Sequence, residues 1–99
     1  MALFFMHMDR KYEMIPEGNL FRIKALRSFD TVIKGQLGGL IESEKNLSHH
    51  GNSWIGYSAR VLSNAKVSEN ARVSDRAIVM CRAKIRGSSL VLGTACVKA

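Results

Sequence analysis

The sequence predicts an all-β protein in which short strands wind into a coil of flat faces, capped by an N-terminal β-hairpin. Three observations support this fold class. The second half of the chain repeats every six residues, and two strand-like segments that flank a turn cluster precede the repeat. The chain has 99 residues, 46% apolar and 23% charged, which suits one small domain with a single core.

The six-residue repeat begins at Ser53 and recurs without a slip at positions 59, 65, 71, 77, 83, 89 and 95. Each first residue of a unit is Ala or Ser, and each third residue is Val or Ile. Six steps of about 100° do not return to one side of an α-helix, so a helix stripe is excluded. Small and branched residues alternate with polar ones as in a short strand. Each unit is therefore predicted to form three residues of strand and three of turn.

This pattern resembles the hexapeptide repeat of the left-handed parallel β-helix. In that family an aliphatic residue fills the interior of a triangular prism and a small residue follows four positions later. Three hexapeptides make one coil, so the resemblance implies two to three coils. The chain is then a single domain, residues 1–99, with a cap and entry segment over 1–50 and the β-helix over 51–99. The matching pairs are Ile55/Ala59, Val61/Ala65, Val67/Ala71, Val73/Ala77, Val79/Ala83, Ile85/Ser89 and Val91/Ala95.

The first half of the chain is predicted to form the hairpin cap. Residues 11–15 and 20–26 nearly alternate in polarity, and residues 16–19 between them form a turn cluster. Residues 2–6 are a candidate third strand. Residues 29–42 are expected to enter the prism, with their glycines at tight corners where a side chain would clash.

Two parts of this half are distinctive: Tyr12 with the run over 20–26, and the run over 35–48, which reads GQLGGLIESEKNLS. Together they resemble a group of small proteins common in phages and prophages, in which the same cap precedes Ala-Arg-Val hexapeptides. That group has no single agreed activity. The resemblance therefore implies a fold and a phage-related setting rather than a mechanism.

The formal net charge of +7 is unevenly distributed. Residues 1–50 carry seven basic and six acidic side chains, whereas residues 51–99 carry eight basic and two acidic ones. A basic second half points to an acidic partner or to nucleic acid, with a solvated basic surface as the structural alternative. No apolar run reaches the roughly 20 residues of a membrane helix, so no membrane partner is expected and a cytoplasmic location is predicted.

Residues 18 apart should stack in columns, and this rule predicts which side chains share a face. Lys66, Arg82, Lys84 and Arg86 are expected to point outward together. As a functional site they would dock phosphates or carboxylates of a partner. As a purely structural feature they would protect exposed sheet from aggregation.

Two other groups of outward positions are candidate contacts. Leu62, Ile78 and Met80 form an apolar patch that predicts self-association as a homo-oligomer, with a dimer favoured and a trimer as the alternative. The structural alternative is that residues 1–30 fold back over this patch. Trp54 should lie over Arg72 as a cation–π stack, either as a partner contact or as a local lid on the first coil.

The sequence gives no strong sign of catalysis. The prism fold resembles acetyl-CoA-dependent acyltransferases, for which His49 or His50 would be the general base, but a polar corner beside Gly51 is the expected role of both histidines. No insertion interrupts residues 53–99. No catalytic residue, metal or cofactor is therefore predicted, and the zinc site of γ-type carbonic anhydrases is excluded because no histidine follows His50.

The cysteines, Cys81 and Cys96, are predicted to be free thiols. Taken together, these features predict a non-catalytic protein that binds a bacterial protein or ribonucleoprotein complex. Its setting suggests a steric inhibitor of a bacterial defence complex, an anti-CRISPR-like role. A basic nucleic-acid-binding module, a minimal acyltransferase and a purely structural assembly module remain as alternatives.

Overall fold

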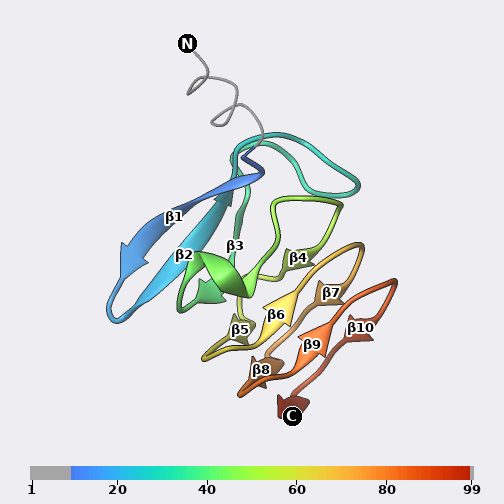
Figure 1. Cartoon of the computed structure of the whole chain (residues 1–99). Coiled ribbons are helices and arrows are strands. Elements are labelled where there is room, and N and C mark those ends of the chain that lie inside the picture. Colours follow the sequence, from blue (N-terminus) through green and yellow to red (C-terminus); the bar gives the residue numbers. More distant parts are fainter. Residues whose placement is uncertain (1–9, 99) are drawn as a thin grey trace.

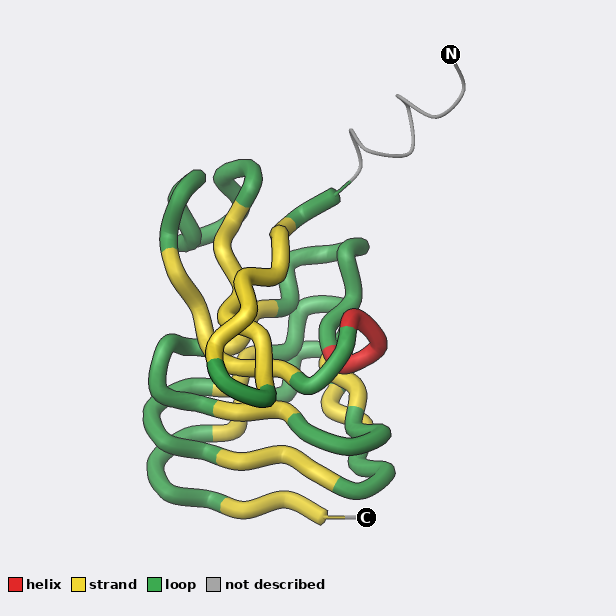
Figure 2. Tube along the Cα trace, turned by 90° about the vertical axis from the view of Figure 1, so that its left-hand side faces the viewer, coloured by secondary structure: helices red, strands yellow, loops and turns green. Residues whose placement is uncertain are grey.

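The computed structural model describes residues 10–98 and shows an all-β chain (Figure 1). A β-hairpin at the start leads into a β-solenoid of about three turns, so the predicted fold class is confirmed. The candidate third strand over residues 2–6 lies outside the described residues. Figure 2 shows the rungs of the solenoid stacked in layers, with the hairpin at one end and the C-terminus at the other.

The hairpin consists of β1 (Tyr12–Glu17) and β2 (Leu20–Ala25), which pair antiparallel with Glu17 opposite Leu20. The turn predicted over 16–19 is therefore shorter than expected, because only Gly18 and Asn19 remain unpaired. Gly18 has a φ of 64°, a conformation that glycine adopts without steric cost. Pro16 belongs to β1, where the edge of the sheet tolerates the missing N–H.

Strand β3 (Leu37–Ile41) joins the hairpin to the solenoid. It pairs antiparallel with β2 on one side and parallel with β5 (Arg60–Val61) on the other. Gly38 and Gly39 lie inside this strand, which corrects the expectation that they form corners. A Cβ atom on Gly39 would lie 2.5 Å from the carbonyl oxygen of Ala59, so only glycine allows this close approach.

The remaining strands form three faces of a prism. The hairpin face contains β3, β5, β8 and β11; the tryptophan face contains β4, β7 and β10; the lysine face contains β6 and β9, with an isolated bridge from Leu47 to Val67. One short 3-10 helix, η1, precedes the first complete coil. The bounds are η1 Glu44–Asn46, β4 Trp54–Ile55, β6 Lys66–Val67, β7 Arg72–Val73, β8 Ile78–Met80, β9 Lys84–Ile85, β10 Leu90–Val91 and β11 Cys96–Lys98.

The core consists of columns of aliphatic side chains that stack from one coil to the next. Val61 is in parallel register with Val79, and Val79 with Val97, so the predicted column of stacked valines is confirmed. Val61 and Val79 are fully buried, while Val97 in the last rung is half-buried. The small residues that follow four positions after the aliphatic ones are also buried through position 83. These are Ala59, Ala65, Ala71, Ala77 and Ala83.

The corners contain a second periodicity that the sequence pattern did not reveal. A residue with positive φ recurs at six-residue spacing along the corners, with position 57 as the exception. Four of these residues are not glycine, and a non-glycine residue in this conformation costs about 1–2 kcal/mol. The corner residues with positive φ are Gly51, Ser63, Glu69, Asp75, Cys81, Gly87 and Gly93.

Candidate functional site

The lysine face brings together the four cations that the repeat predicted. Lys66 is directly opposite Lys84 on neighbouring parallel strands, and Arg82 and Arg86 flank Lys84 at alternate positions of the same rung. All four side chains are exposed. Among the described residues none of the four forms an ion pair or a side-chain hydrogen bond, so their charges are available to a partner.

The coil that carries Arg82, Lys84 and Arg86 contains no carboxylate to offset their charge. No Asp or Glu occurs after Asp75 in the sequence, and that carboxylate accepts a hydrogen bond from the backbone N–H of Gly93. The backbone under the cations is held by ladder bonds, such as Lys66 N–H to the carbonyl of Ala83 at 2.9 Å. The result is a positively charged surface on a hydrogen-bonded sheet.

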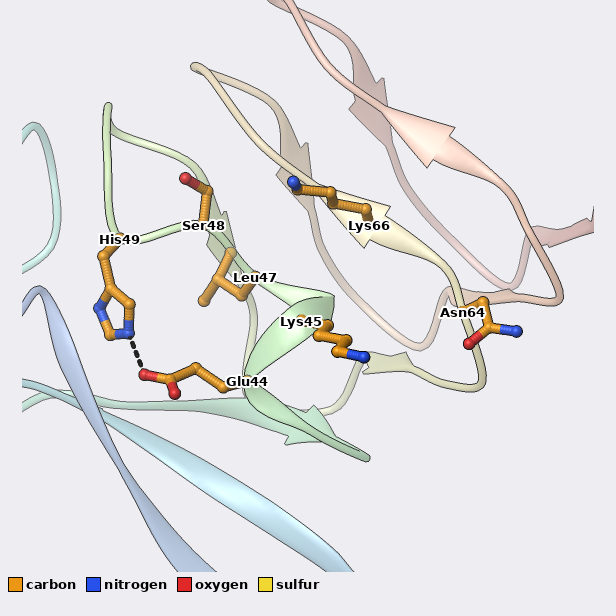
Figure 3. Close-up of a pocket in the computed structure, with 7 residues that line it drawn as sticks. All are labelled: Glu44, Lys45, Leu47, Ser48, His49, Asn64 and Lys66. Carbon is orange, nitrogen blue, oxygen red and sulfur yellow. Dashed lines mark hydrogen bonds and ion pairs between the residues drawn. The ribbon is translucent and has the colours of Figure 1, made fainter.

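A hollow of about 410 Å³ adjoins the lysine face (Figure 3). Lys66 and Asn64 contribute one wall from the coil, and His49 and Glu44 contribute the opposite wall. Lys45, in the middle of η1, also lines this hollow and adds another exposed cation without an ion pair among residues 10–98. The hollow therefore extends the basic surface toward the cap.

His49 is a structural link between the cap and the solenoid. Its Nδ1 accepts a hydrogen bond of 3.1 Å from the backbone N–H of Lys11, and its Nε2 lies 2.7 Å from Oε2 of Glu44. Its ring also stacks on Tyr12 with a centroid separation of 4.1 Å. Because both ring nitrogens are engaged, His49 has no free lone pair for general-base chemistry in this arrangement. His50 is exposed in the following corner.

Two buried polar residues beside His49 were not anticipated from the sequence. The Lys11 ammonium donates hydrogen bonds to the carbonyl oxygen of Ser53 at 2.7 Å and to its Oγ at 3.1 Å. Burial, followed by the nearby charges of Arg27 and Arg72, lowers the pKa of Lys11 to about 8. Burial also raises the pKa of Tyr12, whose hydroxyl donates to the carbonyl oxygen of Leu47.

The predicted apolar patch is present on the hairpin face but is not fully open. Leu62, Ile78 and Met80 are each half-buried. Ile78 is opposite Arg60 in the parallel register, so a charged side chain interrupts the apolar surface. Self-association through this patch stays a prediction.

The expected stack of Trp54 on Arg72 is not formed. The two residues are in register, but the Trp54 side chain is 3% exposed and packs edge-to-face against Phe29, with ring centroids 5.5 Å apart. The Arg72 guanidinium turns instead to Asp30, at 2.6 Å, and Thr31, at 3.2 Å. Trp54 is thus buried beneath the loop after β2, where it covers the first coil as the lid alternative predicted. Its burial corrects the other alternative, that it contacts a partner at the surface.

No known protein family model matches the chain, and no curated protein is recognisably similar to it. The resemblance to phage proteins therefore rests only on the residues quoted above. Within residues 10–98 no helix is long and apolar enough to cross a bilayer. The same residues contain no cluster of three or more His, Cys, Asp or Glu side chains placed to hold a metal ion. Cys81 and Cys96 are exposed free thiols.

A second group of polar residues gathers where the hairpin meets the solenoid, on β2, on β5 and at the corners before β5 and β8. Arg22, Tyr57, Arg60 and Arg76 line a shared hollow there. The 18-residue spacing of Ser58 and Arg76 places those two in one column, but no sequence signal placed Arg22 beside them.

Proposed function

We propose that this protein is a non-catalytic binding protein whose lysine face docks on an acidic surface of a macromolecular partner. One observation carries the proposal: Lys66, Arg82, Lys84 and Arg86 are exposed on β6, on β9 and just beside β9, and no carboxylate among residues 10–98 is paired to them. Unpaired like charges in register repel each other, so a partner that neutralises them removes a cost that the free protein carries.

The partner would be a bacterial protein or ribonucleoprotein complex, and the protein would occupy a site that the complex needs for its own substrate. The resemblance of residues 12–26 and 35–48 to phage proteins supports a bacterial defence complex as that partner. Binding by a rigid face needs little reordering of the protein, which favours steric inhibition without catalysis. A mimic of nucleic acid would have to be acidic, whereas this chain has a net charge of +7.

The test is a phage-plating assay on bacteria that carry an active CRISPR–Cas complex, with and without the protein. We expect the protein to raise the plating efficiency of the targeted phage. The double substitution Lys84→Glu/Arg86→Glu should abolish this rise. The matched control is Lys34→Glu/Lys98→Glu, which changes the net charge by the same amount at two exposed sites outside the four-cation cluster.

Binding measured with the purified complex completes the test. The charge-reversed variant should lose affinity by at least about tenfold, while the control variant keeps it. Equal affinity of both variants would remove the lysine face from the binding site. If instead the protein binds free double-stranded DNA with a steep salt dependence, it is a nucleic-acid-binding module and the inhibitor proposal fails.

A further inference from the structure

The junction between hairpin and solenoid holds a hollow of about 500 Å³ that is separate from the lysine face. Its walls come from β2, from β3, from the corner after β4, and from β5 and β8. Three arginines, an exposed tyrosine and two aliphatic side chains therefore meet at one place. The lining residues are Arg22, Leu40, Tyr57, Ser58, Arg60, Arg76 and Ile78.

Arg22 is fixed and holds the pocket together. Its guanidinium donates to both carboxylate oxygens of Glu17, at 3.1 and 2.5 Å, and to the carbonyl oxygens of Gly38, at 3.1 Å, and Tyr57, at 2.6 Å. The side chain is thereby tied to β1, β3 and the corner after β4. Because these bonds occupy the guanidinium and the residue is only 8% exposed, Arg22 positions the pocket and is not free to bind a ligand.

Tyr57 provides a planar apolar surface. One face of its ring lies over the Arg22 guanidinium, 3.9 Å from the ring centroid, while 57% of the residue remains exposed. A large exposed aromatic ring held in place by a cation is a stacking platform, because a second flat group can cover its open side. Leu40 and Ile78 add aliphatic surface to the same hollow.

Arg60 and Arg76 supply the charge. Both are exposed, and neither forms a side-chain hydrogen bond or ion pair among residues 10–98. Arg60 projects from β5 between Leu40 and Ile78, its register partners on either side. Arg76 lies in the next layer at the corner before β8, in the same column as Ser58. Guanidinium groups of this kind bind phosphate oxygens through paired N–H donors.

We propose that this hollow is a binding site for a nucleotide unit, with the base stacked on Tyr57 and the phosphate held by Arg60 and Arg76. A volume near 500 Å³ is within the range of small-ligand sites. The ligand chemistry is a planar base joined to a phosphate, either as a free mononucleotide or as one unit of a single strand. The assignment does not depend on the lysine face, which lies on a different face of the prism.

Calorimetric titration of the full chain with adenosine 5′-monophosphate tests the site, and a 12-nucleotide oligouridylate distinguishes the two sources. Tighter binding of the oligonucleotide than of the mononucleotide would identify a single strand as the ligand, and equal binding would identify a free nucleotide. Adenosine and inorganic phosphate should each bind more weakly than the mononucleotide. We expect both contacts to be required for full affinity.

Three variants locate the binding. Tyr57→Ala should weaken it by at least about fivefold, because base stacking contributes on that scale, while Tyr57→Phe should retain it. Arg60→Gln/Arg76→Gln should weaken binding by about tenfold or more and flatten its salt dependence. Tyr57→Ala keeps the backbone carbonyl that Arg22 contacts, so the fold is expected to survive. Lys34→Gln/Lys98→Gln, at two exposed sites that line neither hollow, removes the same charge as the matched control and should change nothing.

The proposal is overturned if neither nucleotide probe gives saturable heat up to millimolar concentration. It is also overturned if Tyr57→Ala and Arg60→Gln/Arg76→Gln both bind the nucleotide probes as the unmodified protein does. A hexaglutamate peptide that binds as tightly as the mononucleotide, with no loss on Tyr57→Ala, would assign the arginines to an acidic protein surface instead. Each of these results is distinct from failure of the lysine face to bind its partner.

Discussion

Lys66 and Lys84 occupy directly opposed positions on two parallel strands, and both are exposed without an ion pair to any carboxylate in the described part of the chain. Neighbouring strands lie about 4.8 Å apart, so the two like charges raise the free energy of the folded chain. The lysine face therefore carries a like-charge repulsion that lowers the stability of the folded chain.

Lys84→Glu should stabilise the isolated protein while it weakens partner binding. The substitution replaces a like-charge pair with Lys66 by an opposite-charge pair, which should raise the free energy of unfolding by about 0.2–1 kcal/mol at low salt. Urea denaturation measures the change, and the gain should shrink in 1 M salt because screening weakens both interactions. Lys34→Glu is the control, and an equal gain there would show an effect of net charge alone.

Asn46→Ala should destabilise the protein by about 2–4 kcal/mol in denaturant unfolding. The buried amide accepts hydrogen bonds of 2.9 Å from the backbone N–H groups of Glu42 and Ser43, and it donates to the carbonyls of Ser63 and Ala65. Removal of the side chain leaves these four backbone groups without that partner. Residue 64, an exposed asparagine, is the matched control, and its substitution by Ala should change stability by less than about 0.5 kcal/mol.

Gly39→Ala should cost more stability than Gly87→Ala. At Gly87 the added methyl group meets nothing within 4 Å, and its φ of 68° alone should cost about 1–2 kcal/mol. At Gly39 the methyl group would lie 2.5 Å from the carbonyl oxygens of Gly56 and Ala59, so β3 must shift away from the first coil. We expect a difference of at least about 1 kcal/mol in thermal or urea unfolding. Equal costs would show that β3 tolerates displacement.

Stability should rise with pH between about 8 and 10 because of Lys11. Its pKa is lowered to about 8 in the folded protein against 10.5 for the free group, so the unfolded chain binds more protons in this range. The free energy of unfolding should then increase by up to about 1.4 kcal/mol per pH unit. Above pH 10 the raised pKa of Tyr12 acts in the opposite direction, because the unfolded tyrosine ionises first.

Urea unfolding at several pH values measures this profile, with Lys11→Met as the comparison. The variant has no ammonium at this position and should lose the rise between pH 8 and 10. If the unmodified protein shows a flat profile over that range, the Lys11 ammonium is not held at a lowered pKa. A rise that persists in Lys11→Met would have to come from another group.

The six-residue repeat by itself determines most of the solenoid. A period of six with a branched residue at each third position fits short strands stacked in coils with the branched side chains inward, and Val61, Val79 and Val97 stack accordingly. The same period places Lys66 and Lys84 in one column. Residues on one strand or in one column are related by fixed spacing, so sequence alone predicts their neighbourhood.

The cap has no such repeat, so its contacts with the solenoid were determined by the tertiary structure alone. The position of the hairpin brings Arg22 to Tyr57 and Lys11 to Ser53, contacts between residues 35 and 42 positions apart that no periodicity relates. The loop over residues 29–32 buries Trp54 and draws Arg72 to Asp30, which removed the predicted cation–π stack. Long-range contacts of this kind depend on how two packed units share a buried surface, and a linear pattern does not contain that information.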